Sequence, residues 1–76
     1  MSQFEWEMKF REAIDPIPGV HRVYHNDEYG SDDEMVIVVE ASCAYSDHAD
    51  EYLIRKRYNE VARYCPYNTR LDIEWE

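Results

Sequence analysis

Three histidines and two groups of carboxylates are the residues of this chain whose types and spacing could support chemistry. His21 and His25 lie four residues apart, and on a β-strand that even spacing would place both side chains on one face. The carboxylates are Asp47, Asp50 and Glu51 around His48 and Asp72, Glu74 and Glu76 at the end of the chain. Imidazole and carboxylate together suit zinc or another divalent metal. A metal site is therefore one hypothesis, without a compact motif such as HExxH to support it.

The two cysteines do not indicate nucleophilic catalysis. Cys43 lies near His48 in the sequence, but a reactive thiolate needs a positive or helix-terminal setting, and the local charge is negative. Cys65 falls on the apolar stripe of a predicted helix and is expected in the core. The acidic segment 26–34 has neither the ligand spacing of a calcium loop nor the convergent carboxylates of two-metal phosphoryl transfer. The chain is therefore predicted to have no catalytic residues and not to be an enzyme.

The overall charge narrows the choice of partners. Seventeen Asp and Glu residues against eight Lys and Arg residues give a formal net charge of −9. Such a field repels phosphate backbones and anionic membranes, so we expect a protein partner with a basic surface, no nucleic acid and no membrane. The seven tyrosines, some of them expected on the surface, suit a protein interface. A charge that only keeps a small protein soluble is the alternative interpretation.

The first predicted element is a helix over Ser2–Ile14. Ser2 and Glu5 have the spacing of a capping box, and helix-forming residues dominate the segment. The apolar residues that form one helical stripe are Trp6, Phe10, Ala13 and Ile14. The alternating residues that would instead form a strand are Phe4, Trp6, Met8 and Phe10. The cap and the propensities favour the helix, and a strand remains the alternative for residues 3–11.

Two prolines and Gly19 end this first helix, and four further elements follow. Their predicted bounds are a strand over Val20–His25, a strand over Glu34–Ala41, a helix from Ser46 or Asp47 to about Tyr64 and a strand over Thr69–Glu76. Residues 26–33 are polar and contain a glycine, which predicts a hairpin loop. The continuous β-branched run of the second strand predicts a central position in the sheet.

These elements predict a single α+β domain over residues 1–76. In the order α-β-β-α-β, the first two strands form a hairpin, and a right-handed crossover through the second helix returns the last strand to the same sheet. We therefore expect a three-stranded sheet with two helices packed on one face, a ferredoxin-like arrangement.

The segment Phe10–Val20 carries a family resemblance, because a helix there ends in Pro-Gly-Val before a strand. From about Phe10 to Glu76 the chain resembles the cytosolic C-terminal domain of cation diffusion facilitator metal transporters. The resemblance implies a domain that dimerises and binds zinc or a related ion. Its ligand positions match His48 at the second helix and His25, displaced by about one residue, near the first turn. On the last strand, Glu74 and Glu76 stand where the family prefers His and Asp. The resemblance thus makes His25, His48, Glu74 and Glu76 candidate metal ligands.

Together these features predict a small, acidic, non-catalytic regulatory or protein-interaction module that forms a homodimer. A divalent-metal-binding domain and an acidic nucleic-acid mimic are the two alternatives. The first dozen residues lack the basic and apolar regions of a signal peptide, and two cysteines do not make a disulfide framework. A cytoplasmic location with reduced thiols is therefore expected.

Overall fold

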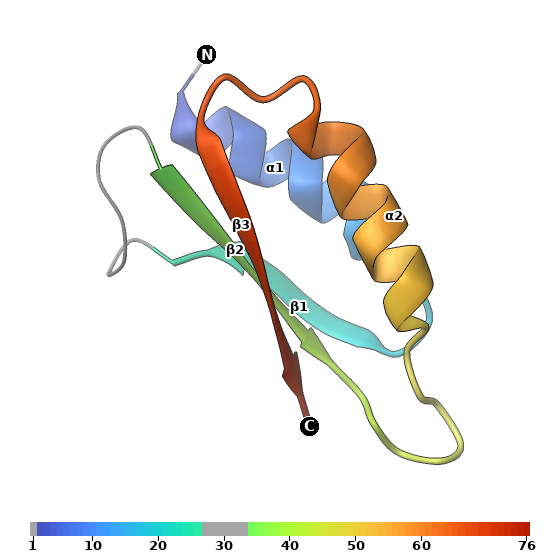
Figure 1. Ribbon diagram of the computed structural model, residues 1–76. Helices are drawn as coiled ribbons and strands as arrows, with labels where there is room; N and C mark the ends of the chain where they lie inside the picture. The colour runs from blue at the N-terminus through green and yellow to red at the C-terminus, as the bar shows by residue number, and fades with distance from the viewer. Residues whose placement is uncertain (1, 27–33) are drawn as a thin grey trace.

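The computed structural model describes residues 2–26 and 34–76, which form two helices and three strands (Figure 1). Their bounds are α1 Gln3–Ile14, β1 Val20–His25, β2 Glu34–Ala41, α2 Glu51–Ala62 and β3 Asn68–Trp75. The predicted α+β class and the order α-β-β-α-β are confirmed. The predicted hairpin loop over 26–33 lies, apart from Asn26, outside the described residues.

The segment Gln3–Ile14 is helical, so the strand alternative for it is wrong. The hydroxyl of Ser2 accepts a hydrogen bond from the backbone N–H of Glu5 (3.3 Å), which caps the helix. The buried residues of α1 are Trp6, Phe10 and Ile14. Phe4, which belongs to the alternating pattern but not to this stripe, is 66% exposed. The helical period prevails because only its stripe reaches the core.

The three strands form one mixed sheet in the order β1-β2-β3. β1 runs antiparallel to β2, and β3 runs parallel to β2 after the crossover through α2. β2 is therefore the central strand, as its β-branched run predicts. Figure 1 shows both helices on one side of this sheet, which confirms the predicted packing.

The core lies between the helices and the sheet. The fully buried side chains of β2 that belong to it are Met35, Ile37, Val39 and Ala41. Phe10 of α1 stacks on Tyr58 of α2 with ring centroids 5.5 Å apart. The Tyr58 hydroxyl donates a hydrogen bond to Oγ1 of Thr69 in β3 (2.8 Å). These contacts join both helices to the sheet, although α2 covers β3 only in part.

The helix α2 begins at Glu51, so the predicted start at Ser46 or Asp47 is wrong. Asp50 is the N-cap, because its backbone is extended and its side chain accepts a backbone N–H of the first turn. Asp47 instead accepts a hydrogen bond within the preceding loop. His48 therefore precedes the helix and does not begin it.

The face of the sheet opposite the helices carries two buried valines without a covering helix (Figure 1). Val36 and Val38 are only 2% and 1% exposed. Side chains of the outer strands lie beside them, since Tyr24 of β1 is opposite Val38 in the register and Arg70 of β3 is opposite Val36. We call this surface the open face. It places polar and charged groups over a narrow apolar strip.

Candidate functional site

The loop 42–50 forms one end of the molecule, and Gly19 holds it in place. The Gly19 carbonyl accepts the backbone N–H of Ser42 (2.7 Å), and the Ser42 carbonyl accepts the N–H of Ala49 (2.9 Å). Gly19 has a φ of 87°, in the left-handed region that favours glycine, and Ala49 is fully buried against it. The Pro-Gly-Val turn thus serves as the support of this loop.

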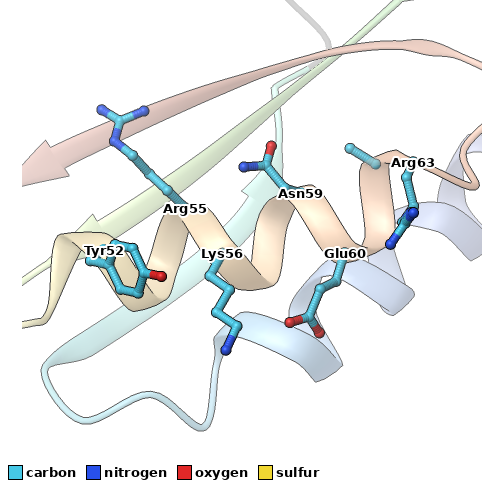
Figure 2. Close-up of a pocket in the computed structure, with 7 residues that line it drawn as sticks. Tyr52, Arg55, Lys56, Asn59, Glu60 and Arg63 are labelled. Atoms are coloured by element: carbon cyan, nitrogen blue, oxygen red, sulfur yellow. The ribbon is translucent and has the colours of Figure 1, made fainter.

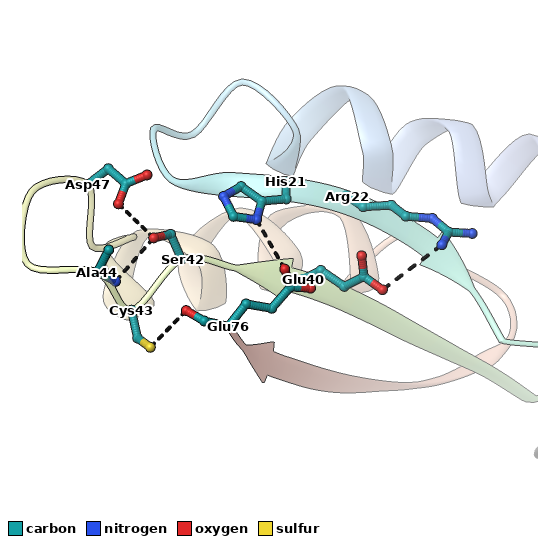
Figure 3. Close-up of polar contacts among 8 residues, drawn as sticks. All are labelled: His21, Arg22, Glu40, Ser42, Cys43, Ala44, Asp47 and Glu76. Carbon is teal, nitrogen blue, oxygen red and sulfur yellow. Dashed lines mark hydrogen bonds and ion pairs between the residues drawn. The ribbon is translucent and has the colours of Figure 1, made fainter.

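A buried serine organises the interior of the loop (Figure 3). The Ser42 hydroxyl donates to Oδ1 of Asp47 (2.7 Å) and accepts the backbone N–H of Ala44 (3.1 Å). Because the serine is buried, these bonds supply the partners that its hydroxyl needs. They also fix the exposed Asp47 carboxylate relative to the sheet.

Glu76 is bound to the same end of the molecule (Figure 3). Its backbone N–H donates to the carbonyl of Ala41 (2.8 Å), and its carbonyl accepts both the backbone N–H (2.9 Å) and the thiol (2.8 Å) of Cys43. Its carboxylate lies 3.3 Å from Nδ1 of His21. The start of β1, the end of β2 and the end of β3 therefore meet at this point.

Exposed aromatic rings and carboxylates gather at this end, which we call the acidic end. Its residues are Tyr45, Asp47, His48, Asp50, Tyr52, Trp75 and Glu76. Tyr45 is fully exposed, and the rings of His48 and Trp75 contact each other with centroids 5.0 Å apart. Residues 42–52 contain no Lys or Arg. Exposed aromatic rings therefore lie beside carboxylates at this end of the molecule.

The predicted metal ligands lie in different parts of the molecule. His48 and Glu76 belong to the acidic end, His25 ends β1 at the opposite end of that strand, and Glu74 lies on the open face. In the described part of the chain, no three His, Cys, Asp or Glu residues form a group that could hold a metal ion. The structure therefore brings two of the four candidates to one end of the molecule without assembling a coordination site.

The two histidines of β1 also have separate surroundings. The register of β1 against β2 shifts between Val20 and Arg22, so His21 sits at a bulge and the even spacing to His25 no longer sets a common face. His21 contacts Glu76, whereas the backbone N–H of His25 donates to the Glu7 carboxylate (2.7 Å). The bulge is the reason that strand periodicity alone misplaces this pair.

The pKa of Tyr24, on the open face, depends on the charged side chains around its phenol. The Arg22 guanidinium lies over its ring, 4.2 Å from the centroid. Partial burial raises the pKa of Tyr24 above the ordinary value, and the carboxylates of Glu74 and Glu40 raise the same pKa further. The guanidinium of Arg22 acts in the opposite direction. Carboxylates from β2 and β3 therefore converge on this phenol.

The Tyr24 pKa provides a test of this geometry. We expect the phenol to titrate above about 10, its ordinary value. Glu74→Gln should lower the pKa, because a repelling charge is lost, and Arg22→Gln should raise it, because an attracting charge is lost. Nuclear magnetic resonance of the assigned ring through alkaline pH measures both shifts. Shifts of the same sign in the two variants would contradict the arrangement.

This pKa has a consequence for stability at high pH. The folded pKa of Tyr24 lies above the unfolded one, so its contribution to the free energy of unfolding is complete below the unfolded pKa. That contribution falls as the pH rises through the folded pKa. Urea denaturation measures the free energy of unfolding at neutral and at alkaline pH. The decrease between the two pH values should be smaller for Tyr24→Phe than for the unmodified chain.

The outer side of α2 is a basic surface that the net charge conceals. Four of the eight basic residues of the chain lie on α2 and its C-cap: Arg55, Lys56, Arg57 and Arg63. Three of them line a shallow hollow of about 720 Å³ together with Tyr52 and Asn59 (Figure 2). The sequence signal for this surface is the run Arg55-Lys56-Arg57, which a whole-chain charge count averages away. Glu60 also lines this hollow and Arg55 pairs with Glu51 (2.9 Å), so the surface concentrates positive charge on α2 next to the acidic end, which it adjoins at Tyr52.

Both cysteines are free thiols. Cys65 is partly buried against the core, although it lies beyond the end of α2 at Ala62 and not on the predicted helical stripe, and burial raises the pKa of its thiol. Cys43 is exposed, with its thiol directed to the carbonyl of Glu76. The two thiols therefore differ in accessibility and are not paired with each other.

Comparison of the chain with protein-family models, with curated proteins and with solved structures finds no match in any of the three. The resemblance to the cation diffusion facilitator domain is thus supported only in its α-β-β-α-β order and its three-stranded mixed sheet. Within residues 2–26 and 34–76, neither helix has the length and apolar character needed to cross a bilayer.

Proposed function

We propose that this protein is a small non-catalytic binding module that engages a basic surface of a protein partner through its acidic end. The observation that carries the proposal is the grouping of three exposed rings, Tyr45, Tyr52 and Trp75, with the carboxylates of loop 42–50. Aromatic rings supply large contact areas at interfaces, and surrounding carboxylates favour a cationic partner.

The supports of loop 42–50 favour this use. Gly19, Ser42 and Asp47 are linked by hydrogen bonds, and Glu76 is bound to the adjacent strand end. A loop that is already held in one conformation loses less entropy on binding than a free segment does. The acidic end therefore has the preorganisation that an interaction surface needs.

The carboxylates of the acidic end also affect the rate of association. A basic partner is attracted to Asp47, Asp50 and Glu76, so association should be faster at low salt. Salt screens such attraction over a Debye length of about 10 Å at 0.1 M. Salt-sensitive binding is therefore a direct consequence of the proposal.

The two alternatives relate to this proposal in different ways. A nucleic-acid mimic is a special case of it, in which the basic surface of the partner is a nucleic-acid groove. Metal binding, which the family resemblance implies, is a distinct function for His25, His48, Glu74 and Glu76. Only His48 and Glu76 of these four reach the same end of the molecule, and among the described residues no three His, Cys, Asp or Glu form a group that could hold a metal ion, so we favour protein binding.

The test is affinity capture followed by quantitative binding. The immobilised protein is incubated with lysate of the source cells at low and high salt, with zinc and with chelator, and captured proteins are identified by mass spectrometry. Calorimetry with the purified partner then compares Tyr45→Ala and Tyr52→Ala with the unmodified chain. Each variant should bind about tenfold more weakly or worse, as truncation of an aromatic residue at the centre of an interface does.

Tyr64→Ala is the matched control. Tyr64 is 74% exposed near the basic C-cap Arg63, whereas Tyr52 is 76% exposed at the start of α2. The control should keep the affinity of the unmodified chain. Equal losses in all three tyrosine variants, or no partner that is released by high salt, would contradict the proposal. Capture that requires zinc would favour the metal alternative.

A further inference from the structure

The two outer edges of the sheet differ in their protection. On β1, the outward backbone N–H of His25 is taken by the Glu7 carboxylate of α1, and the strand carries the bulge at His21. Bulges and covering side chains are the devices by which proteins keep an edge strand from pairing with another chain. The β1 edge is thus closed to a further strand.

In the part of the chain that the structure describes, the β3 edge has neither a bulge nor a covering strand, and its only edge-protecting feature is the charge of Arg70, Asp72 and Glu74. β3 pairs with β2 in a continuous register over all its residues, contains neither proline nor lysine, and is the last strand of the sheet that the structure describes. Its helix-side residues Leu71 and Ile73 are only partly buried, because α2 covers this strand incompletely. An eight-residue, partly apolar edge without a bulge is suited to pairing with one more strand.

The charges on β3 make the strand complementary to itself. Arg70 and Asp72 are exposed on the open face, one residue to either side of Leu71. If two copies pair antiparallel with Leu71 opposite Leu71, each Arg70 lies opposite the Asp72 of the second copy, on the same face. The register centred on Asp72 would set each Arg70 opposite the Glu74 of the second copy, but it would also place Asp72 opposite Asp72, a like-charge pair that the register centred on Leu71 avoids.

The same register also matches the helix side of the strand. Leu71, which α2 leaves partly uncovered, meets the Leu71 of the second copy, and Ile73 lies opposite Thr69. Tyr67 and Trp75 come opposite each other at the two ends of the pair. The register centred on Asp72 would pair Leu71 with Ile73 on this side, so the repulsion between the two Asp72 carboxylates is what favours the register centred on Leu71.

We propose that two copies of this chain form a homodimer by antiparallel pairing of their β3 strands, centred on Leu71, which joins the two sheets into one six-stranded sheet. The interface is isologous, so it closes with two copies and leaves the two β1 edges as the outer strands. Because the strands run antiparallel, the two acidic ends lie at opposite ends of the joined strands. The dimer thus presents two separate copies of the proposed binding surface.

Reversing the charges of Arg70 and Asp72, which lie opposite each other in the proposed strand pair, tests the dimer. Sedimentation equilibrium should give twice the 9.2 kDa monomer mass for the unmodified chain. Arg70→Asp and Asp72→Arg each place like charges opposite one another, and each should weaken dimerisation about tenfold or more. An equimolar mixture of the two variants restores both opposite-charge pairs and should form a heterodimer. The double variant R70D/D72R should again form a homodimer.

The controls separate this interface from general charge effects and from the proposed function. Arg57→Asp makes the same change of charge on the exposed side of α2 and should leave dimerisation unchanged. Circular dichroism checks that each variant is folded. Formation of a heterodimer on mixing also requires both variants to be folded. A monomeric unmodified chain at millimolar concentration, or a mixture that stays monomeric, would overturn the proposal. Tyr45→Ala should leave the dimer intact, so failure of partner binding and failure of dimerisation are distinguishable.

Discussion

Replacing Phe10 by Ala should destabilise the domain by about 3–5 kcal/mol, as removal of a fully buried ring does. Phe10 is completely buried and stacks on Tyr58 with centroids 5.5 Å apart, so the variant loses the contact between α1 and α2 as well as the apolar area. A chain of this length has roughly 4–11 kcal/mol of stability in total. Urea denaturation followed by tryptophan fluorescence and circular dichroism should show unfolding that begins at very low urea, with almost no folded baseline before the transition.

Phe4→Ala on the same helix is the matched control. The substitution is chemically identical, but Phe4 is 66% exposed, so the free energy of unfolding should change by no more than about 0.5 kcal/mol. Similar losses in the two variants would mean that the alternating pattern, and not the helical stripe, marks the buried side of α1. The comparison therefore tests the choice between helix and strand that the sequence leaves open.

Local sequence patterns predict the bounds of an element correctly where only one interpretation of the pattern is available. The β-branched run of β2 and the two prolines before β1 define those strands, and the structure gives them the predicted bounds Val20–His25 and Glu34–Ala41. At α2, three residues could each serve as N-cap, namely Ser46, Asp47 and Asp50. The buried hydroxyl of Ser42 engages Asp47, which leaves Asp50 to cap the helix. That choice depends on a tertiary contact, so the sequence could not predict it.

The candidate site depends even more on contacts between distant segments. His48 and Glu76 are two of the four metal ligands that the resemblance implies, and they reach the same end of the molecule, where His48 lies beside Trp75 and no third ligand of the described chain joins them. The parallel register that sets Trp75 opposite Ala41 carries the end of β3 to loop 42–50. No spacing within either segment encodes that meeting, whereas the exposed tyrosines and carboxylates of the loop could be predicted from composition.

Replacing Gly19 by Ala should strongly destabilise the fold although it adds only one carbon atom. A Cβ at this position would lie 2.5 Å from the Asp47 carbonyl oxygen and 2.8 Å from the Ala49 nitrogen, both backbone atoms. The φ of 87° adds strain for any residue with a side chain. Strain and overpacking together should cost about 2–5 kcal/mol. Chemical denaturation measures this loss, and faster hydrogen exchange at the Ser42 and Ala49 amides would locate it.

Pro18→Ala distinguishes this effect from a general loosening of the turn. Pro18 is exposed, and its replacement acts chiefly through the entropy of the unfolded chain, at a cost of about 0.4–1 kcal/mol. If Gly19 acts by supporting loop 42–50, Gly19→Ala should also weaken binding of a basic partner under conditions where the variant is still folded, and Pro18→Ala should not. Equal small effects of the two substitutions on stability and binding would show that the loop does not depend on Gly19. The preorganisation argued for the acidic end would then lose its structural basis.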